Sequence, residues 1–435
     1  MRRLIVTAAA LALAAPAGAQ TARDTTPAVI RAGRIFDSEA GRMVPNQEIL
    51  IQNGRIVEVA ASVKRPAGAR VYDLSRYSVL PGLIDAHTHL LYLESPKGSL
   101  TMEGVRSLVT EGLPLRALHG AARARTFLAA GITTVRDLGN SGLFGDVALG
   151  TAIDDGSVDG PRLIPSGPGL SPVGGQFPGL KPGYEHLAAD EYRIIKSPAD
   201  AAEAVRENVT FGARVIKIFS NNTPNPGNLT LEEIEAIVAS AKLHGVRVAA
   251  HATNDAAVWR AAKAGVNSIE HAYQVADSTL ALMAANGVAM VPTDVDSLGI
   301  IRYITLQSGQ APPDAAVSRY LAGGRDRMLR AIQAGVTIAA GSDNYLDLDQ
   351  PQGQSARGNL LAYHAAGMSA VDVLRAATLN DAKLLGYEGR LGVIKAGAFA
   401  DLIAVDGDPV GGDFEALTRV RFVMKAGTVY AGQPR

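Results

Sequence analysis

The chain has 435 residues, of which 47% are hydrophobic and 19% are charged, and its 42 basic residues balance 42 acidic ones. This length and apolar content exclude a disordered chain and indicate one large domain with a smaller companion. The lack of a basic excess speaks against binding to nucleic acid, so the expected partner is a small molecule.

The first predicted segment in chain order is a secretory signal peptide over residues 1–19. Arg2 and Arg3 precede an apolar stretch over residues 4–15, and Ala-Gly-Ala at residues 17–19 forms a small-residue cleavage site. The stretch is shorter than the roughly 20 residues that span a bilayer. We therefore expect cleavage after Ala19, export to the periplasm or the medium, and no stable membrane span afterwards. An uncleaved N-terminal anchor is the alternative.

Both ends of the remaining chain predict a small β-structure. Residues 28–79 carry short β-branched segments separated by turn signals such as Asn53-Gly54, and residues 388–435 have the same character. We expect the two ends to pack together as one β-sandwich domain.

Residues 80–387 alternate short apolar strands with alanine-rich helices, which is typical of repeated βα units around a parallel sheet. Eight strands are predicted, the number that closes an α/β fold of the (β/α)8 TIM barrel type. They cover residues 79–86, 132–137, 162–166, 215–219, 246–250, 268–270, 289–292 and 337–340. The predicted helices cover residues 115–130, 197–211, 230–244, 255–264 and 323–334.

Two further features concern the helix starts and the loops. Ser197 and Thr230 are expected to cap the helices that begin there, the latter with Glu233 three residues on. Long connections over residues 167–192 and 294–320 follow the third and seventh strands, where barrel enzymes place substrate loops. Plain surface insertions are the alternative.

Polar residues end five of these strands, on what would be the catalytic face of the barrel. His87 and His89 stand two residues apart, which on a strand turns both rings to one side, as a metal chelate requires. Asp85, on the same strand face, is a candidate partner of His87. Lys217 lies inside an apolar strand, where an unpaired ammonium is costly to bury, so we expect it to be neutral, paired or chemically modified. The other candidate ligands end strands five, six and eight: His251, His271 and Asp343.

In this order and on these strands, the six residues resemble the binuclear metal centre of the amidohydrolase superfamily. The resemblance extends over nearly the whole mature chain, including Pro-Gly-Leu-Ile-Asp at residues 81–85 and the segment over residues 389–403. It implies that His87, His89 and Asp343 bind one divalent metal and that His251 and His271 bind the other, with carboxylated Lys217 and a hydroxide as bridges. Zinc is the expected ion, and the lack of cysteine is consistent with imidazole and carboxylate ligands.

The resemblance further implies hydrolysis of an amide or peptide bond in a small substrate, with Asp343 as general acid and base. The prolidase-like, imidazolonepropionase-like branch is most similar, and its members cleave dipeptides such as Xaa-Pro, or N-acyl amino acids. One-metal deaminases carry an acidic residue where this chain has Asn254. Two alternatives stay open: a lactone, carbamate, cyclic imide or organophosphate ester hydrolase with the same site, and a non-catalytic binding protein on the same scaffold. Formation of a homo-oligomer also stays open.

Two positions depart from that branch. Its members often carry Gly-Gly-His after strand three and a tyrosine three residues past the strand-five histidine, whereas this chain has Gln176 and Asn254 there. Other side chains would then bind the substrate, or each could be an ordinary surface residue. The candidates are His186, Tyr184, Gln176, Tyr273, Arg302 and Tyr303.

Overall fold

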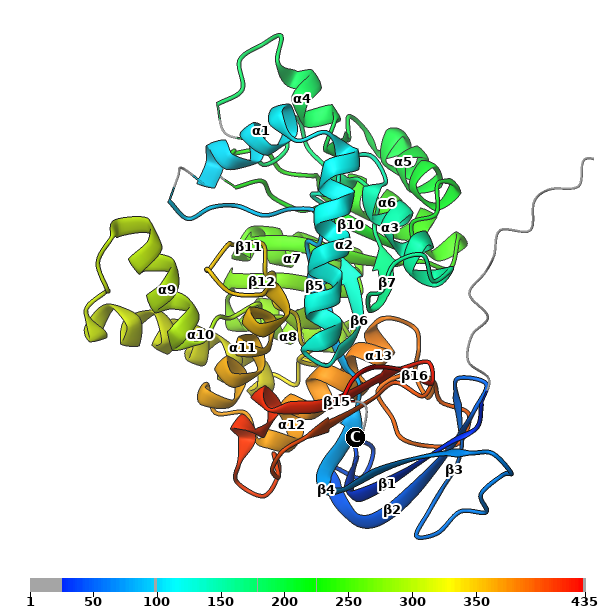
Figure 1. The fold of residues 1–435 in the computed structure, drawn as a ribbon. Helices are drawn as coiled ribbons and strands as arrows, with labels where there is room; N and C mark the ends of the chain where they lie inside the picture. Colours follow the sequence, from blue (N-terminus) through cyan, green and yellow to red (C-terminus); the bar gives the residue numbers. More distant parts are fainter. Residues whose placement is uncertain (1–25, 98–99, 178, 224, 433–435) are drawn as a thin grey trace, which may run out of the picture.

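The computed structural model describes residues 26–97, 100–177, 179–223 and 225–432, which form a mixed α/β fold (Figure 1). The predicted signal peptide over residues 1–19 lies outside these described residues. Every helix in the described part is too short or too polar to traverse a bilayer.

The strands at the two chain ends join in one seven-stranded sheet of order β16-β15-β14-β4-β1-β2-β3. Its strands are β1 (Ala28–Asp37), β2 (Arg42–Gln52), β3 (Arg55–Ala60), β4 (Arg70–Pro81), β14 (Leu402–Val405), β15 (Val420–Lys425) and β16 (Thr428–Ala431). β4 and β14 run antiparallel with Leu80 opposite Ile403, so the two chain ends lie side by side. Residues from both ends form one apolar core, which includes Phe422. Tyr72 packs against this core, and its ring centroid lies 5.5 Å from that of Phe422. This arrangement is consistent with the expected β-sandwich.

Between these ends lie two sheets in which all strand pairs are parallel. One has the order β5-β6-β7, with β5 (Leu83–Thr88), β6 (Ile132–Asp137) and β7 (Arg162–Pro165). The other has the order β13-β12-β11-β10-β8-β9, with β8 (Gly169–Ser171), β9 (Tyr192–Ile194), β10 (Val215–Phe219), β11 (Arg247–Asn254), β12 (Ser268–Gln274) and β13 (Ala289–Val291). Within each sheet, the carboxyl ends of the strands therefore meet at one edge.

Residues 337–340, predicted as the eighth strand, lie between β13 and β5. The segment makes two backbone hydrogen bonds with Met290 of β13, and the Ala340 carbonyl accepts a hydrogen bond from the Ala86 N–H of β5 at 2.8 Å. Only Ile338 forms a ladder bridge, with Met290, so the segment is shorter than a regular strand. These bonds join the outer strands of the two sheets, which is consistent with a (β/α)8 barrel.

Helices follow most of these strands and pack on them, as α6 packs on β11 and α7 on β12. They are α1 (Leu100–Thr110), α2 (Leu113–Ala129), α3 (Gly145–Asp154), α4 (Glu185–Ala189), α5 (Pro198–Thr210), α6 (Leu231–Leu243), α7 (Asp255–Ala264), α8 (Asp277–Ala285), α9 (Ser297–Ser308), α10 (Asp314–Gln333), α11 (Gln352–Ala365), α12 (Ala370–Arg375) and α13 (Asp381–Leu384). A π-helical turn covers Ala376–Asn380 and a 3-10 turn covers Phe414–Thr418. The predicted caps are confirmed, because Ser197 accepts a hydrogen bond from the N–H of Asp200 and Thr230 forms a capping box with Glu233.

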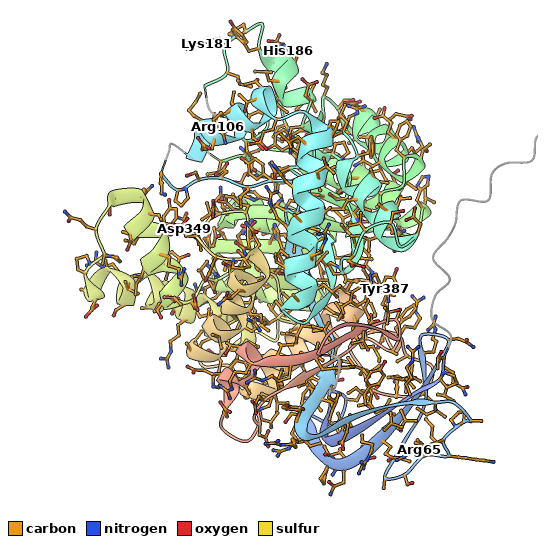
Figure 2. All side chains as sticks on the ribbon, viewed as in Figure 1. Arg65, Arg106, Lys181, His186, Asp349 and Tyr387 are labelled. Atoms are coloured by element: carbon orange, nitrogen blue, oxygen red, sulfur yellow. The ribbon has the colours of Figure 1, made fainter. Side chains whose placement is uncertain are left out.

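Several predicted element boundaries differ from the structure. Predicted strand one is divided between β4 and β5, and predicted strand three is β7, which pairs with β6 and ends one residue early at Pro165. The two predicted long loops contain regular structure: β8 and α4 in the first, and α9 in the second, after which α10 begins at Asp314 rather than at residue 323. Asp296 starts α9 by accepting a hydrogen bond from the Gly299 N–H at 2.8 Å, a capping signal that the sequence prediction missed. The first loop reaches the periphery of the molecule, where Figure 2 labels Lys181 and His186.

Candidate active site

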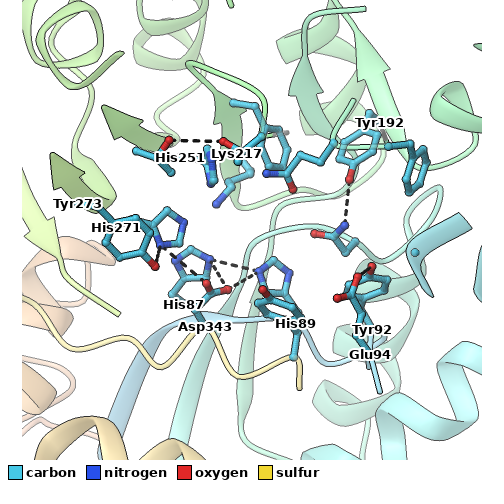
Figure 3. Close-up of a pocket in the computed structure, with 18 residues that line it drawn as sticks. His87, His89, Tyr92, Glu94, Tyr192, Lys217, His251, His271, Tyr273 and Asp343 are labelled. Atoms are coloured by element: carbon cyan, nitrogen blue, oxygen red, sulfur yellow. Dashed lines mark hydrogen bonds and ion pairs between the residues drawn. The ribbon is translucent and has the colours of Figure 1, made fainter. Parts of the chain in front are cut away.

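A cavity of about 260 Å³ opens at the carboxyl ends of the parallel strands (Figure 3). Its wall includes all six predicted metal ligands: His87, His89, Lys217, His251, His271 and Asp343. His87 lies on β5 and His89 directly after it, and the other four come from β10, β11, β12 and the chain just after residues 337–340. The fold therefore brings together side chains that are far apart in the sequence.

Three of the six side chains lie in direct contact. His87 Nε2 is 3.2 Å from His89 Nε2, and Asp343 Oδ1 is 3.1 Å from His89 Nε2 and 3.4 Å from His87 Nε2. One ligand atom from each residue lies within 4.8 Å of the others. Because His87 lies on β5 and His89 follows the end of that strand at i+2, both rings face the cavity, and this trio can hold one cation.

The Nδ1 atoms of the two histidines contact oxygen atoms deeper in the protein. His87 Nδ1 lies 2.8 Å from Glu270 Oε2, and His89 Nδ1 lies 2.9 Å from the Gly139 carbonyl oxygen. Glu270 also accepts a hydrogen bond from Arg136 Nη2 at 2.9 Å, deep in the protein. Contacts of this kind fix ring orientation and tautomer around metal sites. The prediction from sequence did not include Glu270, although an acid inside an apolar strand signals a buried cationic partner.

Backbone geometry brings Asp343 to the histidines. A Cβ on Gly341 would lie 2.8 Å from His87 Cβ, so glycine permits the close approach of this segment to β5. Asp343 has a φ of 51°, and its N–H donates to the His87 carbonyl at 2.8 Å. Asp85 accepts hydrogen bonds from the N–H groups of His87 at 3.1 Å and Ser342 at 2.9 Å. It therefore holds the backbone on both sides of the site, whereas the His87 ring is held by Glu270.

His251 and His271 form the other side of the cluster. Their ring centroids lie 4.7 Å apart, and the His271 ring lies 5.2 Å from that of His87. His271 Nδ1 is 2.8 Å from Thr293 Oγ1. His271 also has a φ of 75°, a left-handed conformation that is costly for a residue with a side chain and is enriched at functional sites. The buried His251 Nε2 has no hydrogen-bond partner among the described residues.

Lys217 is 1% exposed, and no described residue forms a hydrogen bond or ion pair with its ammonium group. The Nζ atom lies 5.3 Å from the centre of the Phe219 ring. Burial lowers the pKa of Lys217 to about 8, although the nearby charges of Glu270 and Asp343 oppose this change. Burial, together with the charge of Lys217, also lowers the pKa of His251 to about 3. The ion pair considered as the alternative for Lys217 is thus absent within the described part of the chain.

Three of the predicted substrate contacts lie at or beside the cavity. Gln176 and Tyr273 line it, and Tyr273 Oη lies 3.4 Å from His271 Nδ1. Tyr303 lines a neighbouring cavity of about 430 Å³, which also reaches Asp343. All three side chains lie close to the six candidate metal ligands, so their role in substrate binding stays a prediction.

The other three candidates lie elsewhere. Arg302 Nη1 donates to the Leu348 carbonyl at 3.3 Å and lines neither cavity. Tyr184 and His186 lie at the start of α4 on the periphery, and Tyr184 is 58% exposed. Neither residue lines the cavity in the described structure.

The cavity wall also contains side chains that the sequence analysis did not single out. They include Tyr92, Glu94, Asn140, Phe177, Tyr192 and Tyr345. Asn225 Nδ2 holds the segment around Gln176 in place by donating to the carbonyls of Gly175 at 2.8 Å and Phe177 at 2.7 Å. Tyr92 and Glu94 follow His87 and His89 in the first loop of the barrel. That position was the sequence signal that could have identified them as cavity residues.

Imidazole and carboxylate groups gathered at the carboxyl ends of parallel strands form the kind of site found in hydrolases that use metal ions. The amidohydrolase family profile matches residues 78–432. Ochratoxinase from Aspergillus niger is 27% identical over 439 residues, which cover 93% of this chain and 86% of that protein. Imidazolonepropionase from Sphingopyxis alaskensis is 24% identical, with 84% of this chain and 88% of that protein covered. The crystal structure of a Xaa-Pro dipeptidase with bound methionine in its active site has a TM-score of 0.79 and 29% sequence identity, covering 94% of this chain and 100% of that one.

The chain belongs to the amidohydrolase family, and within it to the prolidase-like, imidazolonepropionase-like branch. It is a hydrolase of that family. The resemblance inferred from the residue pattern is thereby confirmed.

Proposed function

We propose that the protein is an exported, metal-dependent hydrolase that cleaves an amide or peptide bond in a small substrate, such as a dipeptide of the Xaa-Pro type or an N-acyl amino acid. The observation that carries this proposal is the convergence of six donor side chains in one cavity. The similarity to a Xaa-Pro dipeptidase supports the choice of a dipeptide. The signal-like segment over residues 1–19 supports export, and N-terminal sequencing of the mature protein should then begin at Gln20.

The donor set fits a pair of divalent cations, with zinc the ion that imidazole and carboxylate ligands suit best. His87, His89 and Asp343 would hold the first cation, because their ligand atoms already lie close together. His251 and His271 would hold the second. The buried, unpartnered His251 Nε2 supports this assignment, since a neutral imidazole nitrogen facing a cavity is a free ligand.

Lys217 would complete the centre in a carboxylated form. Its neutral Nζ would form a bond to the carbon of CO2 and release one proton, giving an anionic carbamate whose oxygens could serve as metal ligands. The reaction replaces a buried ammonium that has no partner among the described residues with an anion among four imidazole rings. The burial and isolation of Lys217 support this modification.

When bound, the metal pair supplies activation of water at neutral pH and polarisation of the substrate carbonyl. Asp343 would accept a proton from the attacking water and pass it to the nitrogen of the leaving amine. The carbon–nitrogen bond then breaks, and the amine leaves with that proton. The acyl part keeps the water oxygen as a carboxylic acid, which becomes a carboxylate by losing the second water proton to the amine or to solvent. Gln176 and Tyr273, which line the cavity, are placed to orient the substrate.

Metal analysis and a hydrolysis screen test this function. We expect about two equivalents of divalent metal per chain, and turnover of dipeptides or N-acyl amino acids in the presence of zinc and bicarbonate. Metal-free protein whose activity a chelator leaves unchanged would overturn the mechanism. Turnover of lactones or organophosphate esters without turnover of any amide would favour the alternative bond type.

The role of Lys217 is tested separately. Lys217→Ala should lose metal and activity, and a small added carboxylate should restore part of both. Lys425→Met is a matched control, because Lys425, on β15 of the β-domain, is also a buried lysine but donates to the Gly160 carbonyl at 2.5 Å. Full metal retention in Lys217→Ala would show that this lysine is structural.

A further inference from the structure

The cavity contains a carboxylate that the proposed mechanism does not use. Glu94 lies in the connection between β5 and α1, lines the cavity near His89 and is 6% exposed (Figure 3). Its carboxylate accepts a hydrogen bond from the Tyr92 hydroxyl. No described lysine, arginine or histidine forms an ion pair with Glu94. Burial raises the pKa of Glu94 to about 7, as expected for a buried acid without a cationic partner.

The surrounding chain fixes the position of Glu94. Its N–H donates to the Tyr345 carbonyl at 2.8 Å, and its carbonyl accepts a hydrogen bond from the Asp347 N–H at 2.9 Å. On the other side, a Cβ on Gly104 of α1 would lie 2.6 Å from the Tyr92 hydroxyl oxygen, so α1 packs closely against the partner of Glu94. The carboxylate is therefore held in the cavity wall between two loops and a helix.

The wall around Glu94 offers little compensating charge, because the charge of His89 only partly opposes the effect of burial on Glu94, and His89 forms its own ion pair with Asp343. The neighbouring lining residues are neutral: Tyr92, Asn140, Gln176, Phe177, Tyr192 and Tyr345. Lys217 is the one lysine or arginine among the described lining residues, and it belongs to the metal-ligand cluster. An ionised carboxylate in a wall of low polarity attracts a cation more strongly than the same carboxylate in water, and a bound cation in turn favours the ionised form of Glu94. A neutral substrate would remove water from this carboxylate without replacing the lost hydrogen bonds.

We propose that Glu94 determines substrate specificity by binding a positively charged nitrogen of the substrate, an ammonium or guanidinium group, next to the amide bond that is cleaved. This inference rests on the proposed hydrolase function. The charged nitrogen can be the free α-ammonium of an unblocked dipeptide or the end of a basic side chain, since both present N–H donors and a positive charge to the carboxylate.

Four peptides distinguish these two sources: alanyl-lysine, alanyl-norleucine and the N-acetylated form of each. Norleucine lacks the side-chain charge and acetylation removes the α-ammonium charge. In the wild-type enzyme, we expect one of the two charges to raise kcat/KM at least tenfold over the matched uncharged peptide. Glu94→Gln, which preserves the size of the side chain and an oxygen for Tyr92, should reduce that ratio at least tenfold. Tyr92→Phe, which removes the hydrogen bond to Glu94, should reduce the ratio less.

Glu103→Gln serves as the control for general charge effects. Glu103 lies on α1 near Glu94 but binds Arg106 at 3.0 Å and does not line the cavity. The ratio should not change in this variant. Equal loss of kcat/KM for all four peptides in Glu94→Gln, or no preference for charge in the wild type, would overturn the proposal.

Calorimetric binding of the same four peptides separates this proposal from the proposed function. Binding that depends on the charge in the wild type and not in Glu94→Gln, without hydrolysis of any peptide, would support the role of Glu94 and refute the peptidase function. Hydrolysis that is indifferent to charge would refute the role of Glu94 alone.

Discussion

Replacing Glu270 with glutamine should lower both the stability of the protein and its affinity for metal. Glu270 and Arg136 are 0% and 1% exposed and lie 2.9 Å apart, and the other carboxylate oxygen lies 2.8 Å from His87 Nδ1. The substitution leaves the Arg136 charge buried without its anion, which costs about 3–5 kcal/mol of unfolding free energy. The single amide oxygen can accept from Arg136 or from His87 but cannot replace both carboxylate contacts. Loss of the contact to the metal-binding ring should weaken metal affinity about 10- to 100-fold.

Two assays measure these effects separately. Urea unfolding of chelator-treated protein gives the stability, and competition with a fluorescent zinc chelator gives the metal affinity. Glu191→Gln is the matched control, because Glu191 and Arg116 are each 3% exposed and lie 2.8 Å apart away from the metal-ligand cluster. It should cost a similar free energy and leave metal affinity unchanged. A loss below about 1 kcal/mol in Glu270→Gln would refute the argument from the buried ion pair, and an equal loss of metal affinity in both variants would refute the specific link to His87.

Three smaller predictions concern local structure and pH. Thr230→Ala removes the cap shared with Glu233 and should cost about 1 kcal/mol in urea unfolding; an unchanged midpoint would contradict the role of the cap. Gly341→Ala forces a Cβ to within 2.8 Å of His87 Cβ, so it should cost about 1–3 kcal/mol and lower the metal content; normal values of both would show that the backbone adapts. Burial lowers the pKa of Lys425 from 10.5 to about 8, so the unfolded state binds more protons between these values and wild-type stability should rise with pH there. Lys425→Met should show a smaller rise, because the contribution of Lys217, whose pKa is also lowered to about 8, remains. Parallel stability curves for the two proteins would disprove the contribution of Lys425.

The sequence predicted the buried strands and several helices because their patterns are local. The bounds of β6, β10 and α7 coincide with those predicted, since each is a short apolar strand or a capped, alanine-rich helix. α9 was missed because its isoleucine, tyrosine and threonine residues weaken the helical signal, and the cap from Asp296 was not used. β8 was missed because it is a three-residue strand inside a predicted loop, and no local pattern shows its pairing with β10 and β9.

The candidate ligands were predictable for a similar reason, and their supporting contacts were not. The rule that polar residues at the carboxyl ends of barrel strands face one site is enough to select residues such as Lys217. In contrast, Arg136 and Glu270 are 134 positions apart, and the contact between them depends on the packing of β6 and β12 inside the fold. His186 was selected because it lies in a long connection, but α4 carries it to the periphery.

Strained backbone and buried polar groups without partners occur together where the six candidate ligands meet. His271 and Asp343 have left-handed backbone conformations, Lys217 is buried without a charged partner among the described residues, and His251 Nε2 is buried without a hydrogen bond. Each of these features costs free energy in a folded protein without a bound ligand. A structural role would be served better by apolar side chains and relaxed backbone at the same positions. The clustering of these costs in one cavity therefore favours a site whose free energy is lowered by what it binds, with the metal-ligand cluster on one side and Glu94 on the other.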